Sequence, residues 1–197
     1  MVDRKSSSQG QVAELIDCIG RLAHFLQFVE GLNPAQWAAL RFLARANRYS
    51  QTPGALACFL RTSRGTTSQT LRVLERKGYV RRIPDRRDRR MIQLELTAAG
   101  AALLDHDPML CVQEAAASLS GEMEGELTEG LSRILRAVQK RCGLDEFGVC
   151  RECGHFLANN AADDRAGPHR CGLTGDPLCE AETRKLCVNI VPITPQA

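Results

Sequence analysis

Hydrophobic and polar positions follow the period of an α-helix over most of the first 142 residues of the chain. Apolar side chains recur every three or four positions from Gln11 to Gly31, which predicts a long amphipathic helix. A second helix is expected from Pro34 to about Ala46, with Asn33 as its N-cap and proline in its first turn. A short helix from Pro53 to about Leu60 follows after a polar turn.

The pattern changes twice between Thr62 and Gly100. Ser63 is a good N-cap for a helix that ends at Lys77-Gly78, a basic last turn followed by a glycine. Residues 79–83 form a short apolar run, and residues 91–96 alternate apolar and polar side chains, so both segments are predicted strands. The segment between them is rich in arginine and is predicted to be a hairpin tip. Helix, strand, charged tip and strand together indicate a helix-turn-helix that carries a wing.

The remaining segments complete the predicted organisation. Thr97 is expected to cap a helix that Pro108 interrupts, and a last helix is expected from about Glu122 to Cys142. Residues 1–10 are interpreted as a disordered leader, 11–142 as the DNA-binding and dimerisation domain with its winged helix-turn-helix at about 34–97, 143–148 as a linker, 149–191 as a cysteine-rich extension and 192–197 as a tail. The fold class is mainly α with a small β-wing.

Charge supports DNA binding by the winged segment. Between Arg61 and Arg90 there are eleven Lys and Arg against three Asp and Glu, a local excess of +8 in a chain whose net charge is only +3. Such asymmetry is typical of a surface that binds phosphates. A solvated charged hairpin is the alternative, but the arginines follow directly after a candidate recognition helix.

The same stretch resembles the MarR family of winged-helix regulators. The resemblance lies in Leu74-Glu75-Arg76-Lys77-Gly78-Tyr79-Val80-Arg81-Arg82, in Asp88-Arg89-Arg90 and in Leu94-Glu95-Leu96-Thr97-Ala98-Ala99-Gly100, and it extends over about residues 10–142. It implies a homodimer that binds pseudo-palindromic double-stranded DNA, usually as a transcriptional repressor released by a ligand or an oxidant. In the family, the first helix and the two late helices form the dimer interface.

The candidate DNA-contacting side chains belong to two groups. The first turns of the predicted recognition helix present residues suited to base edges or phosphates, namely Arg64, Thr66, Thr67, Ser68, Gln69 and Arg72. The predicted hairpin tip offers Arg86, Arg87, Arg89 and Arg90, of which the first three suit a narrow minor groove. Asp88 and Arg90 match the family's Asp-x-Arg pair, and for Asp88 we expect a bracing role.

Five of the nine cysteines lie after residue 148. Cys150 and Cys153 have the spacing of a metal knuckle, Cys171 follows after seventeen residues and Cys187 after fifteen more. Four thiolates in a short segment with few apolar residues favour a metal centre that supplies folding free energy. A set of unconnected thiols is the alternative. Cys179 is predicted not to be a ligand, and His155 and His169 are expected to have surface or supporting roles.

The metal is predicted to be a [4Fe-4S] cluster, with Zn²⁺ as the alternative. Structural zinc sites with four cysteines usually contain two knuckles, and this segment has one. A cubane cluster needs four thiolates but no second knuckle. The segment also faintly resembles the cluster-binding half of high-potential iron–sulfur proteins. Cys18 in the first predicted helix is expected to be a packed, inert thiol.

Three functions follow from these predictions. The first is a DNA-binding regulator whose activity is tuned by the cluster, which senses redox state. The second is a regulator that responds to a small-molecule effector and holds a structural zinc. The third, an electron-transfer protein, is remote, and nothing in the sequence resembles a catalytic dyad, so an enzyme is not expected. The polar N-terminus and the lack of a long apolar run lead us to expect a cytoplasmic protein without a membrane partner.

Overall fold

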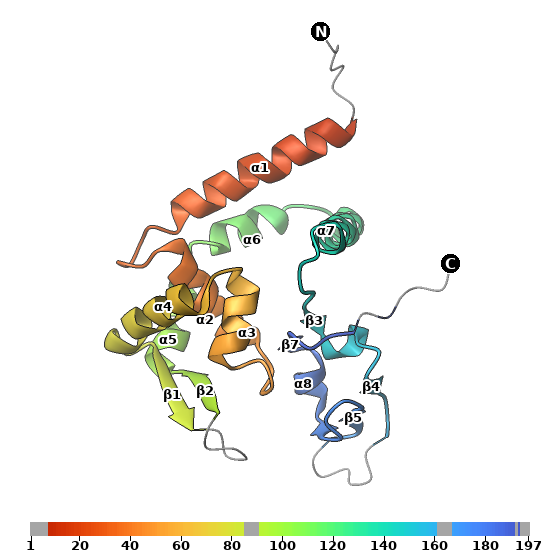
Figure 1. The fold of residues 1–197 in the computed structure, drawn as a ribbon. Helices are drawn as coiled ribbons and strands as arrows, with labels where there is room; N and C mark the ends of the chain where they lie inside the picture. The colour runs from red at the N-terminus through yellow and green to blue at the C-terminus, as the bar shows by residue number, and fades with distance from the viewer. Residues whose placement is uncertain (1–7, 85–90, 161–166, 192, 194–197) are drawn as a thin grey trace.

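The computed structural model describes residues 8–84, 91–160, 167–191 and 193, and Figure 1 shows how its elements are arranged. The described residues up to position 142 form mainly helices, with one two-stranded sheet. In chain order these elements are α1 (Ser8–Leu26), α2 (Pro34–Arg45), α3 (Pro53–Leu60), α4 (Arg64–Arg76), β1 (Val80–Pro84), β2 (Ile92–Leu96), α5 (Ala98–Leu103), the 3-10 helix η1 (Leu104–His106), α6 (Leu110–Ala116) and α7 (Gly121–Arg141). The predicted order of helices and wing strands is confirmed.

Local capping sets the start of most of these helices. The Asn33 side chain accepts from the backbone N–H of Gln36 at the start of α2. The Gln36 side chain in turn accepts from the backbone N–H of Asn33, which completes a capping box. Ser63 accepts from Thr66 N at 3.1 Å at the start of α4. Thr97 caps α5 in the same way, so the caps predicted from sequence are confirmed.

The core of the winged domain (residues 34–97) is formed by α2, α3, α4 and the base of the hairpin. Its largest fully buried side chains are Trp37, Leu40, Phe42, Leu43, Leu56, Leu71, Leu74 and Leu94. Strand β1 pairs antiparallel with β2 in a register that places Val80 opposite Leu96. Because Val80 and Leu94 are buried and belong to different strands, the hairpin is fixed to the helices at its base.

The helix that follows the wing, α5, requires a glycine at position 100. A Cβ at this position would lie 2.2 Å from the backbone oxygen of Tyr79 and 2.8 Å from a methyl of Leu96. Thr97 N also donates to Tyr79 O at 3.0 Å. The start of α5 therefore packs directly on the backbone at the start of the wing.

Helix α1 ends earlier than the predicted Gln11–Gly31. Gln27 lies just beyond its last turn, and its side chain is buried and donates to Ala23 O. The Gln27 Oε1 atom also accepts from Arg41 in α2. Glu30 and Gly31 then adopt positive φ angles, which direct the chain into α2. The long-range contact with Arg41 and these two left-handed residues end the helix, although its apolar periodicity continues.

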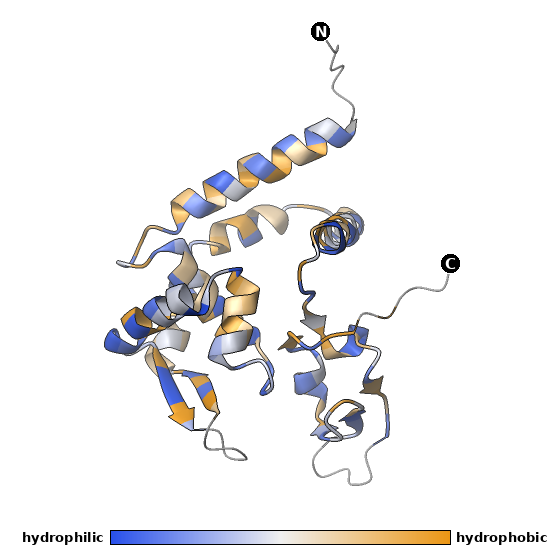
Figure 2. Cartoon of the chain, viewed as in Figure 1, coloured by the Kyte–Doolittle hydropathy of each residue, from blue (hydrophilic) through white to orange (hydrophobic). Residues whose placement is uncertain are grey.

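Two helices leave their apolar faces exposed in the single chain. Figure 2 shows apolar and polar residues alternating along α1. The exposed large apolar side chains are Val12, Leu15, Ile16, Ile19, Leu22 and Phe25 in α1 and Met123, Leu127, Leu131, Ile134, Leu135 and Val138 in α7. Each is at least 39% exposed, which is unusual for so many aligned large apolar residues.

The extension (residues 149–191) forms small sheets and short helices beside α3 and below α7 (Figure 1). Its elements, with the strand that precedes it, are β3 (Gly148–Val149), the 3-10 helix η2 (Cys150–Glu152), β4 (Phe156–Leu157), β5 (His169–Cys171), β6 (Pro177–Leu178), α8 (Glu180–Thr183) and β7 (Leu186–Cys187). Strand β3 pairs with β7, and β4, β5 and β6 form an antiparallel sheet. None of the helices in the described part of the chain has both the length and the apolar character needed to span a membrane.

Candidate DNA-binding face and thiol pocket

The exposed face of α4 carries most of the predicted DNA-contacting residues. Arg64, Thr66, Gln69 and Arg72 are exposed, and Ser68 is partly exposed. The first turn of α4 contains no acidic residue, so its free backbone N–H groups and Arg64 give this end of the helix a positive character. The arrangement provides donors suited to phosphates and to base edges.

Thr67 is a correction to the predicted set. Its side chain is 1% exposed, and its hydroxyl lies 2.9 Å from that of Thr62. The residue packs on the inner side of α4 with Leu71 and Leu74, at the spacing of one helical face. Thr67 therefore supports the helix-turn-helix from inside and cannot contact DNA from this position.

Arg76 is a candidate that sequence reasoning missed. It is exposed and lines a shallow groove on α4 together with Gln69, Arg72 and Glu75. Positions 69, 72 and 76 are three and four residues apart, so the helical period alone could have found it. A second groove, lined by Arg64, Ser68 and Arg82 among others, separates α4 from the wing.

The predicted wing-tip residues lie outside the described residues. These are Arg86, Arg87, Arg89 and Arg90, together with Asp88. The strands that lead to the tip are described, and the Arg81 guanidinium donates to both Glu95 carboxylate oxygens at 2.7 and 2.8 Å across the hairpin. This hydrogen bonding holds the pKa of Glu95 below its usual value.

The extension brings four of its cysteines to one pocket. Cys150, Cys153, Cys171 and Cys187 all line it, although they come from η2, the turn after it, β5 and β7. Cys150, Cys153 and Cys187 are buried, and Cys171 is partly buried. Cys179, by contrast, is exposed at the N-cap of α8 and does not line the pocket. The four thiols predicted as ligands are therefore neighbours, and the fifth is not among them.

The polar contacts of the pocket involve the sulfur atoms themselves. Asn47 Nδ2 donates to Cys150 Sγ at 3.7 Å, and the backbone N–H of His155 donates to Cys153 Sγ at 3.5 Å. Burial raises the pKa of the Cys150 thiol, the Asn47 bond opposes this, and the neighbouring thiols raise it further. Crowded thiols with N–H donors directed at sulfur are an environment that favours thiolates bound to a cation.

Within the described ranges, no group of three or more His, Cys, Asp or Glu side chains is arranged to hold a single metal ion. A tetrahedral zinc would require four sulfurs at about 2.3 Å from one centre. The remaining pocket wall includes the apolar residues Phe156, Leu173 and Leu178.

Two histidines have different positions. His169 bonds to the backbone N–H of Asn159 and to Glu180, so both of its ring nitrogens have partners. His155 lines the pocket with the cysteines, closer to the thiols than a surface role would require. The other thiols lie elsewhere. Cys18 on α1 is exposed in the single chain, and its packed, inert state stays a prediction, because one chain does not test what covers α1 in a dimer.

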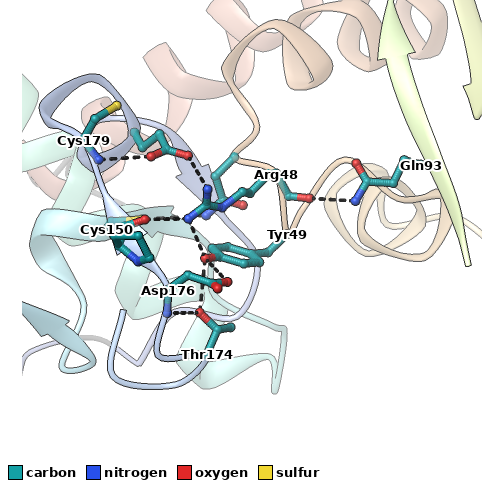
Figure 3. Close-up of polar contacts among 10 residues, drawn as sticks. Arg48, Tyr49, Gln93, Cys150, Thr174, Asp176 and Cys179 are labelled. Atoms are coloured by element: carbon teal, nitrogen blue, oxygen red, sulfur yellow. Dashed lines mark hydrogen bonds and ion pairs between the residues drawn. The ribbon is translucent and has the colours of Figure 1, made fainter. Parts of the chain in front are cut away.

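The winged domain supplies residues to the pocket that the sequence did not indicate. Asn47 and Tyr49, in the loop between α2 and α3, line it together with the cysteines. Figure 3 shows Tyr49 and Arg48 directed at the extension, beside Asp176 and Thr174. Asn47 and Tyr49 are more than 100 positions from the four cysteines in the chain, so no local sequence pattern connects them.

The fold and the exposed α4 face define a winged helix-turn-helix protein with further helices and an added C-terminal region. Residues 30–91 match the model of the MarR family. That family consists of transcription regulators and not of enzymes.

Individual proteins agree with this class. The chain is 38% identical over 72 residues to the transcriptional activatory protein BadR of Rhodopseudomonas palustris, which covers 36% of this chain and 41% of that protein. The chain thus spans about two fifths of the length of this curated relative. Among solved structures it resembles the S. aureus MepR–DNA complex with a TM-score of 0.54, 21% identity and coverage of 69% of this chain and 99% of that one.

Two further solved structures show the same fold. Streptococcus pneumoniae FabT in complex with DNA has a TM-score of 0.55 at 21% identity, over 68% of this chain and 99% of that chain. A MarR transcriptional regulator from Methanosarcina mazei Go1 has a TM-score of 0.54 at 23% identity, over 66% of this chain and 96% of that chain. At such identities the likeness concerns the fold alone, and about a third of this chain lies outside each match.

Proposed function

We propose that the protein is a sequence-specific, DNA-binding transcription regulator that acts as a homodimer and is tuned by an iron–sulfur cluster in its extension. The observation that carries the DNA-binding part is the α4 face, on which Arg64, Thr66, Gln69 and Arg72 are exposed together at the positive end of a capped helix. Two of the structures with this fold were solved with DNA. The expected partner is a pseudo-palindromic duplex, because a two-fold dimer presents two equivalent recognition helices.

The DNA-binding proposal is tested by comparing two groups of variants. Arg64→Ala and Gln69→Ala should lower the ratio of specific to non-specific affinity, each by about 1–3 kcal/mol, because they remove base contacts. Arg87→Ala and Arg89→Ala at the wing tip should weaken binding to all sequences and reduce its salt dependence. Gln113→Ala, an exposed substitution on α6, is the matched control. The role assignment is wrong if the wing variants change sequence preference and the α4 variants do not.

The homodimer is supported by the exposed apolar faces of α1 and α7. A second copy of the chain is the proposed occupant, because a two-fold axis places the same apolar stripe on both sides of one interface. Ile19→Glu and Leu131→Glu should therefore give monomers in light scattering at micromolar concentration. Glu129→Ala, which changes the polar face of α7, should leave the dimer intact. A wild-type monomer under these conditions would contradict the proposal.

The direction of regulation is proposed to be repression, as the family resemblance implies. The relative from R. palustris carries the name of an activatory protein, so this point requires its own measurement. Transcription from a reporter that carries the selected operator should rise when the gene for the regulator is deleted. A fall in the deletion strain would instead identify an activator.

The cluster is proposed at Cys150, Cys153, Cys171 and Cys187. Its support is that the four thiols line one pocket and that two of them, Cys150 and Cys153, accept N–H···S hydrogen bonds. A cluster held there would supply reversible electron exchange and sensitivity to oxidants. A change in the oxidation state of the cluster would then alter the affinity for DNA through the extension.

Anaerobic purification tests the cluster directly. A [4Fe-4S] protein should be brown, with a broad absorption band near about 400 nm and about four irons per chain. Changing any one of the four cysteines to serine should remove or destabilise this signal, whereas Cys179→Ser should spare it. A colourless protein with one zinc per chain would identify the alternative, a ligand-responsive regulator with a structural metal. Folded protein without metal would remove the site altogether.

A further inference from the structure

The loop that joins α2 to α3 (residues 46–51, the coupling loop) contacts both the thiol pocket and the wing. On the pocket side it carries Asn47 and Tyr49, which line the cavity with the four cysteines. On the other side it is bonded to β2, the second strand of the wing. The loop is therefore the segment of the winged domain that contacts both candidate sites.

Hydrogen bonds join this loop to the strand that carries Cys187. Asn47 N donates to Leu186 O at 2.8 Å, and Ser50 Oγ accepts from Val188 N at 3.0 Å. Ala46 and Leu186 also form an isolated parallel bridge. Asn47 and Ser50 are 2% and 0% exposed, so these bonds are shielded from water. The loop and β7 thus form a shared layer behind the pocket.

Asn47 connects this layer to a thiol. Its Oδ1 accepts from Ser50 N at 3.0 Å, and its Nδ2 donates to Cys150 Sγ. The first bond fixes the orientation of the amide, so the second bond depends on where the sulfur lies. A shift of Cys150 would therefore change the packing of the loop.

A second set of contacts clamps the loop to the segment after Cys171. Tyr49 OH donates to Asp176 Oδ2 at 2.8 Å and accepts from Thr174 Oγ1 at 3.1 Å. Arg48 donates to Pro177 O at 2.6 Å and pairs with Glu182 at 3.3 Å (Figure 3).

The wing is attached to the same few residues. Leu94 N donates to Gln51 O at 2.7 Å, and Gln93 Nε2 donates to Arg48 O at 3.3 Å. Figure 3 shows Gln93 reaching the loop from the side opposite to Cys150. Residues 47–51 thus link the Cys150 sulfur to the β2 backbone.

We propose that the coupling loop transmits the loading of the thiol pocket to the wing, so that the metal-loaded protein binds its operator more tightly than the metal-free protein. The inference rests on the proposed cluster. The extension has few buried apolar residues, so its order depends on the group that its thiols hold. When the group is lost, the contacts of Asn47, Tyr49 and Ser50 loosen, and β2 is less restrained. A wing that is already ordered loses less conformational entropy on binding DNA.

The test compares the operator affinity of the metal-loaded full-length protein with that of the metal-free full-length protein. The operator is a duplex that the loaded wild-type protein selects from a random pool. Coupling of ordinary size would give an affinity ratio of about 5- to 150-fold in favour of the loaded form. Tyr49→Phe keeps the ring in the pocket wall but loses the donated bond to Asp176. It should retain the 400 nm band and iron content, and its ratio should fall towards one. Tyr79→Phe, the same change away from the coupling loop, should keep the wild-type ratio.

Gln93→Ala removes one of the two hydrogen bonds on the wing side, away from the thiols, and should lower the ratio with full metal content. Its matched control is Gln113→Ala. A wild-type affinity ratio of one with the cluster present would overturn the proposed coupling but not the proposed function. A wild-type-like ratio in Gln93→Ala would do the same. If Tyr49→Phe fails to retain the cluster, Gln93→Ala decides. Wild-type protein that holds no metal would refute the proposed cluster and this inference together.

Discussion

The winged domain and the extension are stabilised by different means. The winged domain buries a contiguous apolar core that includes Trp37, Phe42 and Leu56, and Leu186 of the extension packs into it. The buried cluster of the extension consists of Cys150, Leu178 and Cys187, so two of its three members are thiols. Burial of large apolar side chains supplies the stabilising free energy in the first region. The second region has too little apolar area to do the same.

The comparison shows what each region needs in order to respond to a signal. A region with its own core stays folded whether or not a ligand is present. A region whose interior is lined by thiols depends on the group that they bind, and its order can therefore be switched. The coupling loop joins the two regions. The responsive extension is therefore next to the DNA-binding winged domain and does not reduce the stability of that domain.

Metal removal should separate the two regions most strongly. In metal-free protein the extension should become susceptible to protease within residues 149–191, while the winged domain stays resistant, because only the extension depends on its thiols. Limited proteolysis with mass spectrometry of loaded and metal-free protein measures this difference. Cys179→Ser, which leaves the pocket lining unchanged, is the control and should behave as wild type. Equal protection of the extension in both forms would contradict the comparison.

Leucine truncation should affect the main unfolding transition only in the winged domain. Leu56→Ala removes a side chain that is 0% exposed and should cost about 2–5 kcal/mol of unfolding free energy, since it leaves a cavity in a packed core. Leu178→Ala, at 2% exposure in the extension, should leave that transition in place. Urea denaturation followed by circular dichroism gives both values. A large loss in Leu178→Ala would mean that the cluster around Cys150, Leu178 and Cys187 also supports the main transition.

Gly100→Ala should be costly because of the close backbone contact with Tyr79. The added methyl group must displace backbone, and overpacking of this kind typically costs about 1–3 kcal/mol. Gly125→Ala in α7 is the matched control, since a Cβ there meets nothing within 4 Å. Replacing this helical glycine should be neutral or stabilising by about 0.4–1 kcal/mol. Thermal unfolding of both variants tests the pair, and similar effects would refute the steric argument.

The smallest expected effect concerns the ion pair across the wing. The pKa of Glu95 is lowered by Arg81, so the pair stabilises the fold above the ordinary carboxyl pKa, and this contribution is lost as pH falls through the lowered value. Glu95→Gln should therefore be slightly less stable than wild type at neutral pH, and the two should converge in acid. Added salt should also reduce the difference, because both groups are exposed. A difference that persists at low pH would point to a contribution other than charge.

Most of the winged domain could be predicted from the sequence because its signals are local. Asn33, Ser63 and Thr97 each cap the helix that follows them, and the cap bonds span three residues. The alternation from Met91 to Leu96 likewise depends on neighbours in one strand. The spacing of the four cysteines also indicated a common site, and the structure brings all four to one pocket.

The sequence by itself thus determined the order of helices and wing, the basic α4 face and the group of four candidate ligands. Only the tertiary structure decided that Thr67 is buried, where α1 ends and what forms the wall of the thiol pocket. Gln27 and Asn47 owe their roles to partners on other segments, at Arg41 and Cys150. A local period cannot encode such contacts, because they form only when packing brings distant segments together.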